Sequence, residues 1–398
     1  MTKRFRAVGL LAACVAGGLA VLALVILAAG ASPVAVGKAL WAGAFGTRYN
    51  AAETLIQAIP LVLTGLAVSL SFRAKLMNIG AEGQLLVGAI AATWIGTSKL
   101  PAPLHLPLCL LAAALAGALW SGLAGALKLW RGVQEVLSTL LLNFVAIQMV
   151  AWMVRGPLQE AAKGFPQSDK LAIPARLALL LPGTRLHGGL FLALFLAGLL
   201  WAYLKFTRAG FFVRAVGAGP DAAEAAGIDI RRVAWGTFLL SGALAGLAGG
   251  VQICGVTYFL ADRYSPGYGY TAIAVALIAS LSPPGVLLSA LFFGALTAGA
   301  SSVQSAGISA VVIQVLQALA LLTLLAYGWL GTHPPAPGTL WVLGLIPTPS
   351  GRGKGRTHPL TPSLRADEVG NTPKGGPGRD AKSEIRREGA GGSAGKSS

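Results

Sequence analysis

The chain has 398 residues, of which 55% are hydrophobic and only 11% charged, and it carries a formal net charge of +17. Soluble domains contain about a quarter charged residues, so this composition excludes an ordinary water-soluble fold. Lys and Arg lie in short clusters between long apolar runs, with no basic face interleaved with aromatic residues, which argues against nucleic-acid binding.

Long apolar runs follow one another along most of the chain. A bilayer core of about 30 Å requires roughly 20 apolar helical residues, because backbone polar groups must be satisfied within the segment. The first run continues to Ala31, longer than the apolar region of a signal peptide, and is interpreted as an uncleaved span. The sequence predicts an all-α polytopic membrane protein with about ten transmembrane helices, at roughly 7–30, 54–72, 78–97, 107–128, 134–154, 188–206, 234–254, 268–282, 285–304 and 308–330.

Two of these segments are the weakest candidates. Residues 78–97 begin with a polar stretch, and residues 268–282 are short and follow a Gly/Tyr/Pro-rich stretch. Both are candidates for broken or re-entrant helices.

The distribution of cations predicts the orientation. With the N-terminus inside, cytoplasmic loops hold twelve Lys and Arg residues against nine outside, five of which lie in the long loop 155–185. We expect both termini in the cytoplasm, in a bacterial-type cytoplasmic (inner) membrane. Residues 1–348 are expected to form the transmembrane domain, and 349–398, rich in Gly, Ser, Pro and mixed charge, a disordered cytoplasmic tail.

No pattern indicates catalysis. The segment 390–397 fits a loosened P-loop pattern, but no strand feeds it and no Walker B partner follows it. The histidines are scattered without an HExxH or GxSxG pattern, and the three cysteines lack metal-site spacing. We expect no catalytic residue, no metal and no directly bound cofactor, so that any ATP is hydrolysed by a separate subunit.

The first polar stretch inside the apolar background is Asn78-Ile-Gly-Ala-Glu82-Gly-Gln84. Polar side chains at membrane depth are expensive and usually functional, which favours a role for Glu82 and Gln84. An equally good interpretation is an interfacial helix start, with Asn78 as the N-cap and Glu82 in the first turn, where the helix dipole favours a carboxylate.

The second stretch, 208–232, lies between two spans on the predicted cytoplasmic side. Pro220 suits a first helical turn, Asp221 and Glu224 favour a helix N-terminus, and Gly227 ends the helix. The residues alone favour a solvated loop helix over a surface that a partner grips.

Several motifs together resemble one known family. They are Asn78 to Gln84, Ser138-Thr139-Leu-Leu-Leu-Asn143, Arg155-Gly-Pro-Leu158, Arg214-Ala-Val-Gly217 and Ala225-Ala-Gly-Ile228. Their order and spacing resemble the ABC transporter permeases, in the simple-sugar and nucleoside branch that has branched-chain amino acid permeases as relatives. The resemblance covers about 50–330. It implies the membrane-spanning permease subunit of an importer that moves nucleosides or simple sugars inward by alternating access.

The resemblance also implies partners and residue roles. It implies an ABC ATPase subunit, a second homologous or identical permease subunit and an extracytoplasmic substrate-binding protein. It implies that 208–232 carries the coupling helix seated on the ATPase, with Arg214, Gly217, Pro220, Asp221, Glu224, Ala225, Ala226, Gly227 and Ile228 as coupling residues. It places Asn78, Glu82, Gln84, Asn143 and Gln148 near the substrate route.

Further candidates come from the residues alone. Gln252, Gln304 and Gln314 are polar positions within apolar spans, and neutral amides suit an uncharged hydroxylated solute. Tyrosines between 258 and 270 can line a vestibule, although interfacial anchoring is commoner. The rival function is an ion-coupled secondary transporter of a small polar solute, which requires titratable groups deep in the spans, and only Glu82 qualifies.

Overall fold

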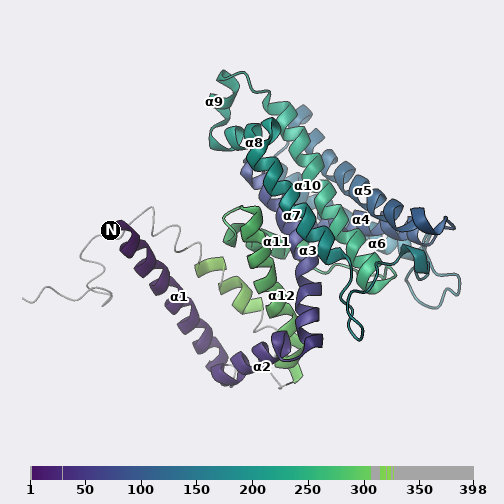
Figure 1. Ribbon diagram of the computed structural model, residues 1–398. Coiled ribbons are helices and arrows are strands. Elements are labelled where there is room, and N and C mark those ends of the chain that lie inside the picture. Colours follow the sequence, from purple (N-terminus) through teal and green to yellow (C-terminus); the bar gives the residue numbers. More distant parts are fainter. Residues whose placement is uncertain (1, 29, 306–313, 320, 324–325, 327–398) are drawn as a thin grey trace, which may run out of the picture. The chain divides into compact units, whose positions relative to one another are not determined.

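The computed structural model describes residues 2–28, 30–305, 314–319, 321–323 and 326, and the regular elements of this part are all helices (Figure 1). The predicted tail, 349–398, and its boundary lie outside the described residues. In chain order the elements are α1 (Thr2–Ala28), α2 (Pro33–Phe45), α3 (Arg48–Arg73), α4 (Ala81–Gly96), α5 (Ala102–Arg131), α6 (Glu135–Arg155), the 3-10 turn η1 (Ile173–Ala175), α7 (Gly189–Phe206), α8 (Arg208–Ala218), α9 (Pro220–Ala225), α10 (Ile230–Gln252), the π-helical turn η2 (Ile253–Thr257), α11 (Tyr268–Ile278) and α12 (Pro283–Ser305).

Six helices of the described part are long and apolar enough to cross a membrane: α3, α5, α6, α7, α10 with its η2 extension, and α12. Each coincides with a predicted span. A seventh span arises only if α1 and α2 are joined, and these helices are bent by 103° at their break. The multi-pass helical class is therefore confirmed, whereas the number ten is not.

Two of the predicted spans are shorter than the membrane requires. α4 has 16 residues and α11 has 11, which at 1.5 Å per residue gives roughly 24 and 16 Å, against a hydrocarbon core of about 30 Å. These are the two segments whose sequences indicated broken helices. The predicted span 308–330 lies mostly outside the described residues.

Helix α2 occupies a segment that the sequence placed in an external loop. Pro33 stands at its first position, where the missing N–H costs nothing, and the helix packs against α12 and α3. Val36 of α2 is buried in a small apolar cluster with Leu296 and Val303 of α12. The contact with α12 gives this short helix the tertiary support that its length alone does not provide.

Small residues bring the central helices together. Gly242 and Gly246 lie four residues apart on one face of α10, and a Cβ at either would overlap the backbone of α5 at Gly117 or Ala113. Such small-residue contacts let helix backbones approach closely where lipid supplies no hydrophobic driving force. Their close approach makes α10 the centre of the bundle, packed against α5, α4 and α3.

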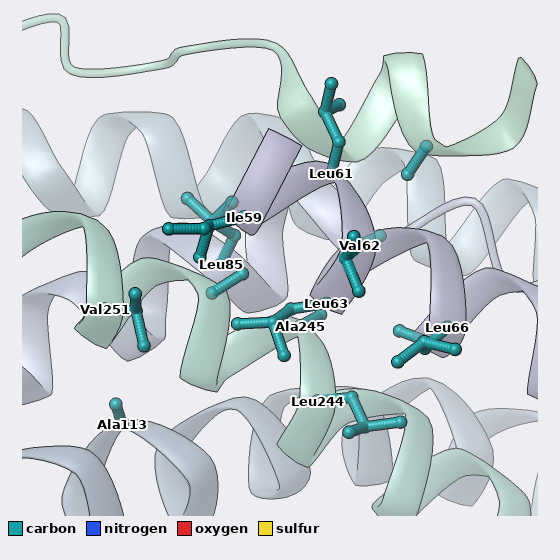
Figure 2. Close-up of a cluster of buried hydrophobic side chains, with 14 of the residues drawn as sticks. Ile59, Leu61, Val62, Leu63, Leu66, Leu85, Ala113, Leu244, Ala245 and Val251 are labelled. Atoms are coloured by element: carbon teal, nitrogen blue, oxygen red, sulfur yellow. The ribbon is translucent and has the colours of Figure 1, made fainter. Parts of the chain in front are cut away.

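The apolar core is built around this centre (Figure 2). Leu63 and Leu66 of α3, Leu85 of α4 and Ala245 of α10 are all less than 1% exposed. Close-packed interiors of this kind hold their neighbours in fixed positions. The polar groups described below are therefore set in a rigid frame.

Helix α3 connects the two ends of the bundle. Near its start, Glu53 pairs with Arg185 of the long loop between α6 and α7. At its end, Arg73 lies against Gly217 of α8. Because α3 has 26 residues, roughly 39 Å separate its ends, so the long loop and the α8–α9 segment occupy opposite ends.

Candidate functional site

A buried polar network surrounds the irregular segment between α3 and α4. Gln84 Nε2 donates to Asn78 Oδ1 at 3.0 Å, and Asn78 Nδ2 donates to Ser241 Oγ at 3.1 Å. Ser71 Oγ donates to the same Ser241 Oγ at 2.8 Å. These four side chains, which we call the polar network, are at most 1% exposed. The polar network joins α3, α4 and α10 through groups that hydrogen-bond mainly to one another.

Asn78 does not cap α4 as one interpretation of the sequence had it. The helix begins at Ala81, with Gly80 as its N-cap. Asn78 Oδ1 instead accepts from the Gly80 amide at 2.9 Å, in a turn in which the side chain bonds the backbone two residues on. This turn directs the chain into the core just before α4.

Asn143 of α6 fixes the same turn from the other side. Its Oδ1 accepts from the Gly83 amide at 2.8 Å, and its Nδ2 donates to the Ile79 carbonyl at 3.0 Å. Thr139, one helical turn earlier, accepts from the Ile79 amide at 3.3 Å. The structure thus brings Asn143 close to Asn78 and Gln84, through backbone groups of 79–83.

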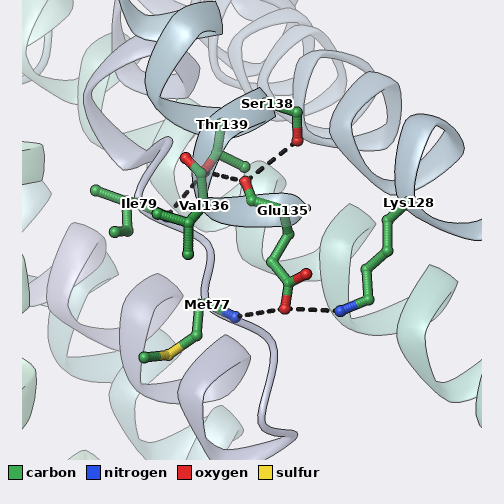
Figure 3. Close-up of polar contacts among 7 residues, drawn as sticks. All are labelled: Met77, Ile79, Lys128, Glu135, Val136, Ser138 and Thr139. Atoms are coloured by element: carbon green, nitrogen blue, oxygen red, sulfur yellow. Dashed lines mark hydrogen bonds and ion pairs between the residues drawn. The ribbon is translucent and has the colours of Figure 1, made fainter. Parts of the chain in front are cut away.

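An ion pair attaches the preceding residues to the α5–α6 turn (Figure 3). Lys128 Nζ lies 2.6 Å from Glu135 Oε1, and the Met77 amide donates to the same oxygen at 3.5 Å. Thr139 Oγ1 donates to the Glu135 carbonyl at 2.6 Å. The end of α5, the start of α6 and residues 77–79 are therefore held as one unit.

Glu82 reaches across to the start of α11. Its Oε1 accepts from Ser265 Oγ and the Gly267 amide, both at 2.9 Å, and its Oε2 accepts from the Gly269 amide at 2.7 Å. Glu82 is 0% exposed. The carboxylate caps the N-terminal end of another helix, where unpaired amides and the helix dipole favour negative charge.

The other predicted pathway amides lie elsewhere. Gln252 is 7% exposed at the end of α10, whereas Gln148, Gln304 and Gln314 are exposed on the surface of the single chain. None of the hydrogen bonds found among the described residues links these four glutamines to the polar network.

Sequence reasoning missed the hydroxyl partners. Ser71, Ser241 and Ser265 give no signal, because isolated serines are common in apolar helices and their partners lie far away in the chain. Tyr268, for which the sequence suggests an anchor or a vestibule residue, donates its hydroxyl to Gln57 Oε1 of α3 at 2.5 Å. This bond fixes the first residue of α11 against α3.

The segment 208–232, which the sequence predicts to be cytoplasmic, contains two short helices, α8 and α9. Pro220 is the first residue of α9, and Gly227 adopts a left-handed φ of 82° where the helix ends, as the sequence predicted. Ala223 faces inward and is 4% exposed. The other residues of α9 after Pro220 and the two that follow the helix are exposed: Asp221, Ala222, Glu224, Ala225, Ala226 and Gly227.

The remaining predicted coupling residues connect α9 to the bundle. Arg214 is exposed on α8, and Ile228 is half-buried after α9. A Cβ at Gly217 would overlap the carbonyl oxygen of Arg73, so α8 touches the end of α3 directly. The exposed helix α9 is therefore connected to the bundle core through the contact of α8 with α3.

The opposite end carries the long loop between α6 and α7. Arg155 lies 2.6 Å from Asp262, and this hydrogen bond holds the pKa of Asp262 below its usual value. The bidentate pairing of Arg185 with Glu53 raises the pKa of the arginine. The first pair joins the end of α6 to the segment before α11, and the second attaches the loop to α3.

Among the described residues, no cluster of His, Cys, Asp and Glu has the composition of a metal site. A multi-pass bundle of apolar helices with half-length helices around a buried polar network is the construction of a membrane protein that carries solutes.

The comparisons with known proteins specify the family. Residues 50–326 match the family model described as branched-chain amino acid transport system, permease component. The chain is 39% identical over 327 residues to the glucose ABC transporter permease protein TsgB13 of Haloferax volcanii, covering 79% of this chain and 85% of that one. It is 38% identical over 311 residues to the guanosine ABC transporter permease protein NupP of Bacillus subtilis, covering 77% and 89%. No solved structure matches.

The chain belongs to this permease family. It is a multi-pass membrane protein and the permease subunit of an ABC importer, a transport component and not an enzyme. As a member of such a system it works with an ATPase and a substrate-binding protein.

Proposed function

We propose that this permease moves nucleosides or simple sugars into the cell. The observation that carries the proposal is the identity of 39% and 38% to permeases named for glucose and guanosine, over more than three quarters of the chain. The side chains buried beside the 78–84 segment are amides and hydroxyls that bond one another and the backbone, so they present no free charge to hold an ion, which suits a neutral solute.

The test is uptake by the complete importer reconstituted in vesicles. We expect ATP-dependent accumulation of labelled guanosine or glucose, competed by unlabelled members of the same class and absent with a non-hydrolysable ATP analogue. Uptake of branched-chain amino acids alone would refute the substrate class. Uptake that persists without ATP and collapses with an ion gradient would instead establish secondary transport.

We further propose that α9 is the helix that sits on the ATPase. Its outward side is exposed and built of small residues between Asp221 and Gly227, so that a groove can close around it. ATP is bound and hydrolysed by that partner, and the permease itself binds no cofactor. Arg214 and Gly217 of α8 then support the seated helix.

Ala225→Trp tests this surface without disturbing the fold, because the position is exposed. We expect the variant to lose co-purification with the ATPase and to lose uptake. Ala162→Trp is the matched control, an exposed alanine in the long loop at the opposite end of the bundle, and should retain the ATPase. Normal ATPase association of Ala225→Trp would refute the proposed contact.

The solute route is proposed to run beside Asn78, Glu82, Gln84 and Asn143. Gln148, Gln252, Gln304 and Gln314 then add polar surface along it or at the contact with a second permease subunit, homologous or identical. We place both termini in the cytoplasm of a cell with a bacterial-type cytoplasmic membrane. In a cysteine-free background, a cysteine at Glu224 should react with an impermeant maleimide only from the inside, and one at Ala162 only from the outside.

A further inference from the structure

The segment between Arg73 and Glu82 holds helix α11 near both of its ends. Its 11 residues span roughly 16 Å, so it ends inside the thickness of a bilayer. At its start Gly267 is left-handed, with φ 76°, and Glu82 accepts hydrogen bonds from the Gly267 and Gly269 amides. The carboxylate therefore defines where α11 begins.

The other end of α11 has an unusual backbone. Ser280 and Leu281 have φ values of 50° and 57°, in the left-handed region that residues other than glycine rarely adopt. Consecutive residues in that region persist only where the surroundings hold them. One such hold is Arg73, whose Nε donates to the Leu281 carbonyl at 3.1 Å.

Arg73 is also one of the residues that α8 touches. Gly217 lies so close to the Arg73 carbonyl that no side chain fits between them. α8 is followed directly by the exposed α9. A displacement of α9 toward or away from the bundle thus reaches Arg73 at the end of α3 through α8, which also contacts α7 and α10.

We propose that Arg73 is a positioning residue that transmits movement of α8 and α9 to α11. The guanidinium pulls on the strained Ser280–Leu281 turn, and Glu82 serves as the pivot at the far end of the half-length helix. The inference rests on the proposed contact of α9 with the ATPase, because that contact supplies the movement. It adds the path by which the movement enters the membrane core.

Arg73→Ala separates this role from assembly. In the reconstituted importer we expect the variant to retain the ATPase and at least half of its ATP hydrolysis, while solute transported per ATP falls at least tenfold. Lys75→Ala is the matched control, because it removes an exposed cation from the same turn. Its transport per ATP should stay within twofold of wild type. An Arg73→Ala variant that also stays within twofold overturns the proposal.

Gly217→Ala approaches the same junction from α8. It should separate α8 from Arg73 and lower transport per ATP, whereas Gly236→Ala, where a Cβ meets open space on α10, should not. Loss of ATPase association in Arg73→Ala and Gly217→Ala would also overturn the inference, since it would place both residues in assembly. Failure of the proposed α9 contact is detected independently, by the Ala225→Trp variant.

A distance measurement in the otherwise unmodified chain tests the proposal even if a variant folds poorly. Spin labels at the exposed positions Tyr270 on α11 and Leu115 on α5, in a cysteine-free background, report movement of α11 against the bundle. We expect their separation to change between nucleotide-free and ATP-trapped importer in the otherwise unmodified chain, and to remain fixed in Arg73→Lys, which keeps the charge without the Nε donor. An unchanged separation in the otherwise unmodified chain refutes the proposal.

Discussion

Replacing Glu82 with glutamine tests whether this carboxylate is a structural clamp or a ligand for solute. Three donors point at it: Ser265 Oγ and the Gly267 amide at Oε1, and the Gly269 amide at Oε2. A glutamine retains one acceptor oxygen for the first two donors. Its NH₂ group then faces the Gly269 N–H, so that two donors oppose each other.

The magnitude follows from the groups left without partners. Each buried unsatisfied polar group costs about 1–3 kcal/mol, and Glu82→Gln creates two, the Gly269 amide and the new side-chain NH₂. Loss of negative charge at the start of α11 adds about 0.3–1 kcal/mol. We expect destabilisation of about 2–7 kcal/mol, which is a large share of the 5–15 kcal/mol typical of a folded protein.

Thermal unfolding of the purified permease measures this cost. Glu160→Gln is the matched control, because Glu160 also accepts three hydrogen bonds, from the Gly164 and Phe165 amides and from Gln167, but at a loop surface where water replaces a lost partner. We expect a midpoint at least about 4 °C lower for Glu82→Gln and a much smaller change for the control. Equal midpoints, with solute affinity reduced only in Glu82→Gln, would show that Glu82 binds solute instead of clamping α11.

Three further outcomes follow from single residues. Burial lowers the pKa of His187, in the loop before α7, from 6.5 to about 4, so the unfolded chain binds the extra proton first as pH falls. The free energy of unfolding should have its full value above pH 6.5 and decline by up to about 3 kcal/mol toward pH 4. His187→Phe should remove this part of the decline, which is measured through the unfolding midpoint. Gly246→Leu should prevent α10 from reaching α5 and abolish the monodisperse peak in size-exclusion chromatography, whereas Gly198→Leu on α7, with open space at its Cβ, should retain it. Gly227→Ala should cost about 1 kcal/mol locally, because its φ is 82°, and should accelerate amide hydrogen exchange in α9 alone.

The sequence predicted the six long spans because bilayer thickness and backbone hydrogen bonding leave few alternatives to an apolar helix. It also predicted the bounds of α9, since Pro220 and Gly227 act through their own backbone angles. The number of spans was less accessible. Hydropathy identifies an apolar segment, but it does not register that the helices formed there, α4 and α11, are too short to cross the membrane.

The residues of the polar network and their partners were also predictable only in part. Asn78, Glu82 and Gln84 stand out because polar residues in an apolar run require partners, and Asn143 was joined to them by resemblance alone. The partners themselves were not predictable, since Ser241 lies 163 residues from Asn78, and Ser265 lies 183 residues from Glu82. Only the fold brings these hydroxyls to the amides and the carboxylate.

The completeness of these hydrogen bonds bears on how a solute moves past them. A carboxylate that holds three donors and amides that hold each other leave little bonding capacity for a sugar or nucleoside, so the network does not need to release a tightly held ligand. What can change is the position of the elements it joins. Glu82 holds the start of α11 and Arg73 holds the turn after it, and these two residues lie only nine positions apart in the chain. A shift of that short segment at the α8 contact therefore reorients α11 as a unit, which gives an importer a way to open a path without breaking its buried polar bonds.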